Sequence, residues 1–174
     1  MQGVWLDEEV QSYNYDLNFL TNTFQLEIQD NIKCLQRNNT IAERFGKASG
    51  IYTTDVSKWC LANIIGREVY PQEVSTTNLS NPSDTQFAGK HLKIANASPA
   101  GKWKTRMMDF ALDFEQTTFN TQRPISFSSW PTLDPLTHTG VVNAPEDRQQ
   151  IDLTKIEIVS APAGIFMSDH AYPY

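Results

Sequence analysis

The chain has 174 residues, of which 40% are hydrophobic and 11% aromatic, which is enough apolar material for one globular core. Its net charge of −6 and its scattered Lys and Arg residues argue against a nucleic-acid partner, because proteins that bind nucleic acid carry a basic face. The sequence has no run of about 18 apolar residues, so no membrane span is expected. Residues 1–6 lack the basic and apolar segments of a signal peptide, so none is expected in this segment.

The cysteines and histidines predict neither a metal site nor a cofactor. Cys34 and Cys60 are too few for a disulfide framework or a Cys-based zinc site. They are expected to be small buried side chains, and a single bridge between them stays open at this stage. His91, His138 and His170 lie far apart, and none shares a short motif with a second ligand.

The N-terminal third predicts a strand, a helix and a loop. Residues 3–6 read as the end of a strand, and Asp16 is a suitable cap for a helix that reaches about Gln36. Apolar residues recur there at intervals of three and four: Leu17, Leu20, Phe24, Ile28, Ile32 and Leu35. Residues 38–54 read as loop, and residues 55–59 as a single turn.

Residues 61–68 carry the most informative pattern in the chain. They form a short apolar run, typical of a buried strand, that ends abruptly on Arg67 and Glu68, and Pro71 prevents the strand from continuing. A carboxylate at the C-terminal end of a buried parallel strand is where barrel enzymes hold an acid or a base. Residues 163–173 end in the same way, with polar and aromatic residues before a proline.

A long polar segment, residues 72–97, follows this strand and is expected to be an insertion. It is predicted to contain a turn at 81–84 and a short helix at 87–94. Ser98 and Pro99 then begin a helix, because serine is a preferred cap and proline suits the first helical position. Its apolar face is expected to continue to about Phe119 and to place Trp103 in the core.

The C-terminal third predicts further strands. Residues 124–131 form an apolar run bounded by prolines, residues 132–150 read as a polar loop, and a last strand starts at Gly164 after a connector at 151–159. Strands that alternate with helices indicate an α/β protein built from parallel β/α units, with its functional groups at the strand C-termini.

Four segments, taken in order, carry a resemblance to a known family: residues 48–57, 65–68, 129–136 and 169–174. Together they resemble the glycoside-hydrolase-like (β/α)8, or TIM-barrel, domain of large bacterial cell-surface and membrane-attached proteins. The resemblance covers most of the chain as a single partial barrel segment, 1–174, of about strands three to six. It implies carbohydrate as the partner, a hydrolase activity and an extracellular or cell-surface location.

Within this resemblance, Glu68 corresponds to the general acid/base at the end of the fourth barrel strand. A glycosidase needs such a carboxyl because the leaving oxygen must be protonated as the glycosidic bond breaks. Many of these enzymes have Asn before that Glu, whereas this chain has Arg67. Arg67 is therefore either a substrate-binding residue or the partner of Glu68 in a structural ion pair.

The resemblance implies further substrate-binding residues after the next two strands. Asp169, His170 and Tyr172 lie at the end corresponding to the sixth strand, where His and Tyr often line the sugar site. Trp130 and Asp134 follow the fifth strand, and an exposed Trp face can stack on a pyranose. The alternative interpretation is that these aromatic residues belong to the core.

The resemblance also implies what this segment lacks. The nucleophilic carboxylate of a retaining glycosidase lies at the end of the seventh strand, roughly 5 Å from the acid/base, and this segment is expected to stop before it. The isolated chain is therefore predicted to be inactive. Three interpretations stay open: a segment of a carbohydrate-cleaving barrel, a non-catalytic carbohydrate-binding domain, or an α/β fragment that self-associates through open sheet edges unless the remainder of a longer chain covers them.

Overall fold

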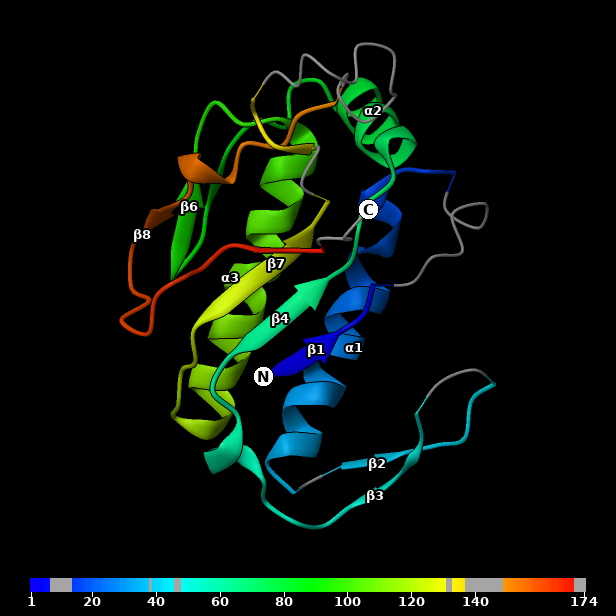
Figure 1. Ribbon diagram of the computed structural model, residues 1–174, viewed down its shortest axis with the longest axis vertical. Helices are drawn as coiled ribbons and strands as arrows, with labels where there is room; N and C mark the ends of the chain where they lie inside the picture. The colour runs from blue at the N-terminus through cyan, green and yellow to red at the C-terminus, as the bar shows by residue number, and fades with distance from the viewer. Residues whose placement is uncertain (7–13, 38, 46–47, 131–132, 137–148, 171–174) are drawn as a thin grey trace.

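The computed structural model describes residues 1–6, 14–37, 39–45, 48–130, 133–136 and 149–170. Over these residues the protein is an α/β structure with three α-helices and a four-stranded parallel sheet (Figure 1), which confirms the predicted class. Tyr172 and most of the predicted loop at 132–150 lie outside the described residues. Closure into a TIM barrel is not seen in the described part of the chain, where the sheet is open.

The central sheet contains strands β1 (Gln2–Val4), β4 (Asn63–Gly66), β7 (Ile125–Ser129) and β9 (Ser168–Asp169). They lie side by side in the order in which they occur in the chain, and each neighbouring pair is parallel. Their C-terminal ends therefore meet at one edge of the sheet. The predicted parallel strands are present, although all four are short.

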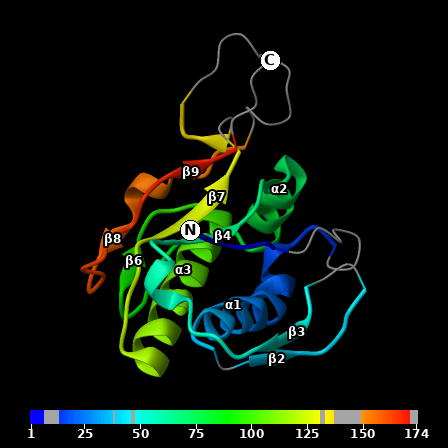
Figure 2. The same ribbon diagram turned by 60° about the horizontal axis from the view of Figure 1, so that its bottom comes forward.

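Two helices cover one face of this sheet, as Figures 1 and 2 show. They are α1 (Thr21–Leu35), which follows a 3-10 turn η2 (Leu17–Leu20), and α3 (Pro99–Phe119). Both begin where the sequence predicts. The Asp16 carboxylate accepts a hydrogen bond from Asn18 N at 3.0 Å, and Ser98 Oγ accepts one from Gly101 N at 3.2 Å.

The core lies between these helices and the sheet. Trp103 of α3 packs edge-to-face on Phe127 of β7, with ring centroids 6.0 Å apart, and Phe24 of α1 contacts both rings. Trp103 Nε1 donates a hydrogen bond to Thr21 Oγ1 at 2.9 Å, which satisfies the only polar atom of a fully buried indole. The prediction that Trp103 belongs to the core is confirmed.

Two smaller antiparallel sheets were not predicted. The segment expected to be loop contains the pair β2 (Asn39–Ile41) and β3 (Gly50–Tyr52). Before β4, the turn expected at 55–59 is present as η3 (Ser57–Trp59), with the Asp55 carboxylate bonded to Ser57 N. Cys34 and Cys60 are both free thiols and half-buried.

The segment 72–97 is more regular than the sequence suggested. It contains most of helix α2 (Pro71–Ser80), the expected turn at 81–84, and strands β5 (Phe87–Ala88) and β6 (Leu92–Ile94). The predicted helix at 87–94 was wrong. In β6 a buried, an exposed and a buried residue alternate, which is the period of a strand rather than of a helix.

Strand β6 also pairs with β8 (Glu157–Ile158), so this three-stranded antiparallel sheet joins two distant segments of the chain beside α3. A 3-10 turn, η6 (Leu153–Lys155), precedes β8. Within the described residues, no helix is both long and apolar enough to cross a bilayer.

Candidate functional site

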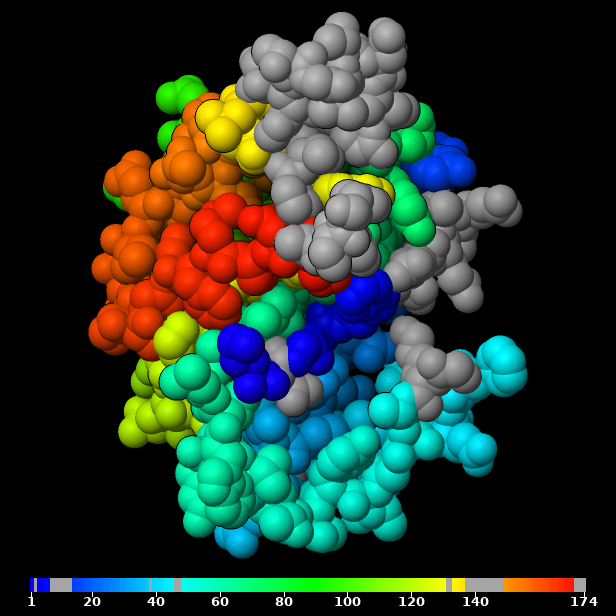
Figure 3. All heavy atoms as spheres, viewed as in Figure 1, coloured from blue at the N-terminus to red at the C-terminus, as the bar shows by residue number. Residues whose placement is uncertain are grey.

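The C-terminal ends of the four parallel strands bring together side chains from four distant segments. Trp5 follows β1, Glu68 follows β4, Ser128 lies near the end of β7 and His170 follows β9. In Figure 3 the N-terminal residues, in blue, lie beside the last described residues, in red, on the face of the sheet that α1 and α3 do not cover. Adjacent parallel strands place these ends next to one another, as the sequence predicts.

The pleat of β7 decides which of its side chains face this site. Phe127 packs on the helices, so Ser126 and Ser128, one residue before and after it, point to the opposite face. There Ser126 Oγ bonds to Ser168 Oγ at 2.8 Å, and Ser128 Oγ bonds to His170 Nε2 at 2.9 Å. Two short polar side chains therefore hold the end of β9 against β7.

Glu68 and His170, both named from the sequence, are in direct contact. The distance between Glu68 Oε1 and His170 Nδ1 is 3.0 Å, and both side chains are partly exposed. Together with Ser128 they form a continuous row of hydrogen-bonded side chains, Glu68–His170–Ser128, at the ends of three adjacent strands. One ring nitrogen therefore faces a carboxylate and the other faces a hydroxyl.

Trp5 forms an aromatic surface at the same edge. Its ring stacks on the His170 imidazole with a centroid separation of 5.8 Å and an interplanar angle of 10°. Trp5 is nevertheless 56% exposed, so it presents apolar area to solvent beside the side chains of Glu68 and His170. A flat exposed indole next to hydrogen-bonding groups is an arrangement that suits the mixed polar and apolar surface of a sugar ring.

Arg67 does not line this site, which corrects its prediction as a substrate-binding residue. The side chain is 1% exposed, and its guanidinium bonds to both carboxylate oxygens of Glu73, at 2.8 and 2.7 Å. It also donates to the carbonyl oxygens of Leu6 and Glu68. Arg67 and Glu68 follow the end of β4 and point to different partners, Arg67 to Glu73 of α2 and Glu68 to His170.

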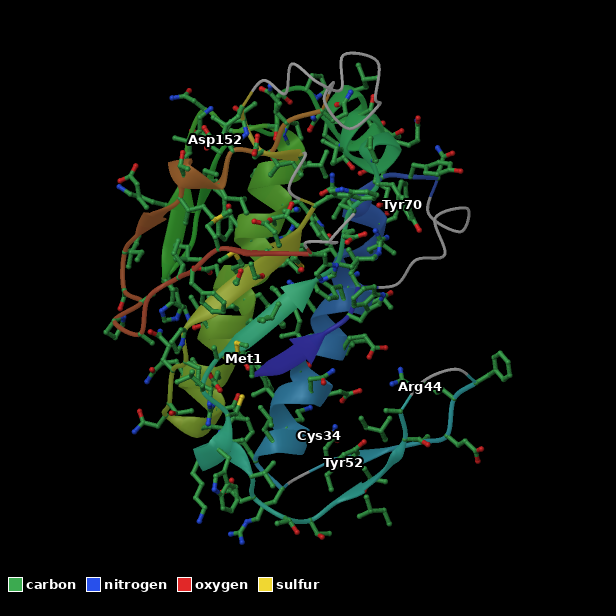
Figure 4. All side chains as sticks on the ribbon, viewed as in Figure 1. Met1, Cys34, Arg44, Tyr52, Tyr70 and Asp152 are labelled. Carbon is green, nitrogen blue, oxygen red and sulfur yellow. The ribbon has the colours of Figure 1, made fainter. Side chains whose placement is uncertain are left out.

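The ion pair of Arg67 with Glu73 fixes the loop between β4 and α2. Glu73 Oε2 accepts a further bond from Tyr70 N at 2.7 Å, and the guanidinium lies 5.2 Å from the Tyr70 ring, labelled in Figure 4. A buried guanidinium requires such a complete set of partners. Arg67 thus stabilises the backbone that carries Glu68.

A second buried cation, Lys104 of α3, lies below the ends of β7 and β9. It is fully buried, and its ammonium donates to Ser129 Oγ at 3.1 Å and lies 4.7 Å from the Phe127 ring centroid. Burial lowers the pKa of Lys104 from 10.5 to about 7, while the nearby Asp169 carboxylate acts in the opposite direction.

The remaining predicted site residues lie in different surroundings. Asp169 is exposed, and its charge acts on buried Lys104. Trp130 is partly buried against the hydrophobic core, and the Asp134 carboxylate caps a turn by accepting a bond from Leu136 N at 2.7 Å. Tyr172 lies outside the described residues. The exposed indole at the strand ends belongs to Trp5, which stacks on His170, and not to Trp130.

Sequence reasoning missed Ser128 and Lys104 as parts of the site region. The only sequence feature that pointed to Ser128 was the alternation of side chains along residues 125–129, which places it on the face opposite Phe127. Lys104 carried a clearer one, because it occupies the face of the helix that also holds Ala100, Met107 and Met108. A lysine on the apolar face of a helix predicts that its side chain is buried in the core.

In the described segments, no group of three or more His, Cys, Asp or Glu side chains is arranged to hold a metal ion. Comparison with protein-family models, curated proteins and solved structures finds no match to this chain.

Proposed function

We propose that this chain is part of a glycoside-hydrolase-like barrel that acts on carbohydrate, with Glu68 as its general acid/base. The observation that carries the proposal is the 3.0 Å contact between Glu68 Oε1 and His170 Nδ1 at the adjacent ends of parallel strands. A carboxyl used for acid/base catalysis must be held in a fixed orientation while one of its oxygens faces the leaving group. The contact with His170 supplies that orientation.

Trp5 supports carbohydrate as the substrate class. Its indole lies beside the Glu68–His170 pair and is largely exposed. The apolar face of a pyranose can stack on such a ring, while the sugar hydroxyls form hydrogen bonds with the neighbouring polar groups. We expect Trp5 to contribute most of the affinity and Glu68 most of the chemistry.

Cleavage also needs a second carboxyl group, about 5–5.5 Å from the first in a retaining enzyme and about 6.5–9.5 Å in an inverting one. The resemblance assigns this group to a seventh strand beyond the segment. We therefore expect these 174 residues to bind oligosaccharides without cleaving them. Turnover of a glycoside by this chain alone would contradict that expectation.

A non-catalytic carbohydrate-binding domain is the second candidate. The observation that favours it is the exposed Trp5 stacked on His170, because this surface can bind a sugar without any second carboxyl. Glu68→Gln separates the two candidates in a protein that contains the remaining strands. Loss of hydrolysis with retained binding supports the enzyme, whereas an unchanged rate removes the acid/base role of Glu68.

Binding is tested first, by calorimetric or NMR titration of the chain with cello-, xylo-, manno- and chito-oligosaccharides. Trp5→Ala is expected to weaken binding at least about fivefold, since an aromatic contact of this kind contributes on the order of 1 kcal/mol or more. Trp59→Ala is the matched control, because Trp59 is 69% exposed but lies in η3, before the other end of β4. Equal effects of the two variants, or no binding of any sugar, would refute the proposal.

A further inference from the structure

We infer that Lys104 controls a local opening at the edge of the central sheet: when its amine takes up a proton, β9 separates from β7 and the ammonium reaches water. Lys104 belongs to α3 and is 0% exposed below the ends of these two strands. Because His170 directly follows β9, the opening also breaks the contact of His170 with Glu68. The candidate site is therefore complete when Lys104 is neutral and loosened when Lys104 is charged.

The surroundings of the Lys104 amine compensate a positive charge poorly. The amine donates to the neutral Ser129 hydroxyl at 3.1 Å and lies 4.7 Å from the Phe127 ring centroid. Within the described segments it forms no ion pair with a carboxylate. A buried ammonium without such a partner is costly, whereas a neutral amine that bonds to a hydroxyl is not. Burial accordingly lowers the pKa of Lys104 from 10.5 to about 7.

Charged groups on three neighbouring elements act on this amine: Asp169 on β9, Arg67 after β4 and Glu73 on α2. Arg67 and Glu73 form a buried ion pair at 2.7 Å, and their effects on Lys104 are opposite in sign. Asp169 exerts the largest effect of the three and favours the charged amine. Since Asp169 is exposed while Arg67 and Glu73 are buried, displacement of β9 is the short route by which the ammonium meets water.

β9 is also weakly attached to the sheet. It is two residues long and lies at the edge, beside β7 (Figure 2). Its end is held by a backbone bond from His170 N to Ser129 O at 3.2 Å and by two serine side chains of β7. In the strand register Asp169 lies opposite Ser129, the residue that binds the Lys104 amine. A short edge strand opens far more readily than the whole fold unfolds.

The direction of the pH dependence follows from the proton that Lys104 takes up on opening. In the open state the amine is in water and has its ordinary pKa of 10.5, whereas burial holds the pKa at about 7 in the closed state. Between these two values the open state binds more protons, so the opening constant rises as the pH falls. Below pH 7 both states are protonated and the constant levels off. From pH 8 to pH 6 it is expected to rise about tenfold.

Amide hydrogen exchange of the full chain, followed by NMR, tests this inference. The amide of His170, which donates to Ser129 O, reports the opening of β9. The amide of Asn63, which donates to Pro124 O where β4 and β7 begin, reports unfolding of the sheet. After correction for the intrinsic exchange rate at each pH, we expect a larger opening constant for His170 than for Asn63, and a rise of about tenfold for His170 from pH 8 to pH 6.

Lys104→Met is expected to lower the opening constant of His170 at pH 6 and to remove most of its rise toward acidic pH. Any titration of His170 and Glu68 themselves is present in both proteins, so the difference between the wild type and the variant reports Lys104. Lys93→Met is the matched control, because Lys93 forms an exposed ion pair with Glu157. This variant should keep the tenfold rise.

Two results would overturn the inference. One is a rise in Lys104→Met that is as large as the rise in the wild type. The other is an equal opening constant for His170 and Asn63 in the wild type at pH 6, because β9 would then separate only when the whole sheet unfolds. The second comparison needs no variant and decides the matter even if Lys104→Met does not fold. No carbohydrate takes part in these measurements, so their outcome is independent of the proposed function.

Discussion

Replacement of Lys104 by methionine is expected to stabilise the protein, and most strongly at acidic pH. Lys104 is fully buried, and its pKa falls from 10.5 to about 7 chiefly because burial disfavours the charged form. Each pKa unit corresponds to about 1.36 kcal/mol, so the charged ammonium costs the folded state about 5 kcal/mol below pH 7. Methionine has a similar unbranched shape and carries no charge.

The sign of the pH dependence follows from the same two pKa values. Between pH 7 and 10.5 the unfolded chain holds a proton on Lys104 that the folded chain has lost. The unfolded state therefore binds more protons, and the free energy of unfolding rises with pH. From pH 6 to pH 9 this group alone is expected to raise the free energy of unfolding by roughly 2–3 kcal/mol, a pH dependence that Lys104→Met removes.

At pH 6 we expect the variant to be more stable than the wild type by roughly 3 kcal/mol, since it also loses the bond to Ser129 and the contact with Phe127. Urea unfolding followed by tryptophan fluorescence at several pH values measures this difference. Lys93→Met is the control, because Lys93 forms an exposed ion pair with Glu157 and should change stability by less than about 1 kcal/mol. If the free energies of unfolding of the wild type and Lys104→Met differ by the same amount at pH 6 and at pH 9, the reasoning is refuted.

Further predictions concern residues that hold the sheet and its helices. Gly66→Ala is expected to destabilise the fold by more than about 1 kcal/mol in urea unfolding, because Gly66 has φ +86° and a Cβ there would overlap the Phe127 ring. Glu115→Gln should cost about 3–5 kcal/mol, since it leaves the Arg123 guanidinium without its buried carboxylate, and a loss below about 1 kcal/mol would contradict that ion pair. Trp103→Phe should cost about 2 kcal/mol in the same assay, and an unchanged denaturation midpoint would show that the buried indole hydrogen bond contributes nothing.

The long helices were predictable because their information is local. The three- and four-residue spacing from Leu17 to Leu35, and the Ser98–Pro99 start, place α1 and α3 within a residue or two of their positions. The β5–β6 hairpin was missed for a related reason. Its strands are only two and three residues long, which is too short for a period to be recognised with confidence in the sequence alone.

The sequence by itself determined that parallel strands end in polar groups, and it named Glu68 and His170 as two of them. Only the tertiary structure decided that these side chains touch, that Arg67 turns away toward Glu73, and that Ser128 and Trp5 complete the surroundings of the imidazole. The physical reason is that a strand pattern specifies which residues share a face, whereas distances between strand ends depend on register and on packing between segments a hundred residues apart.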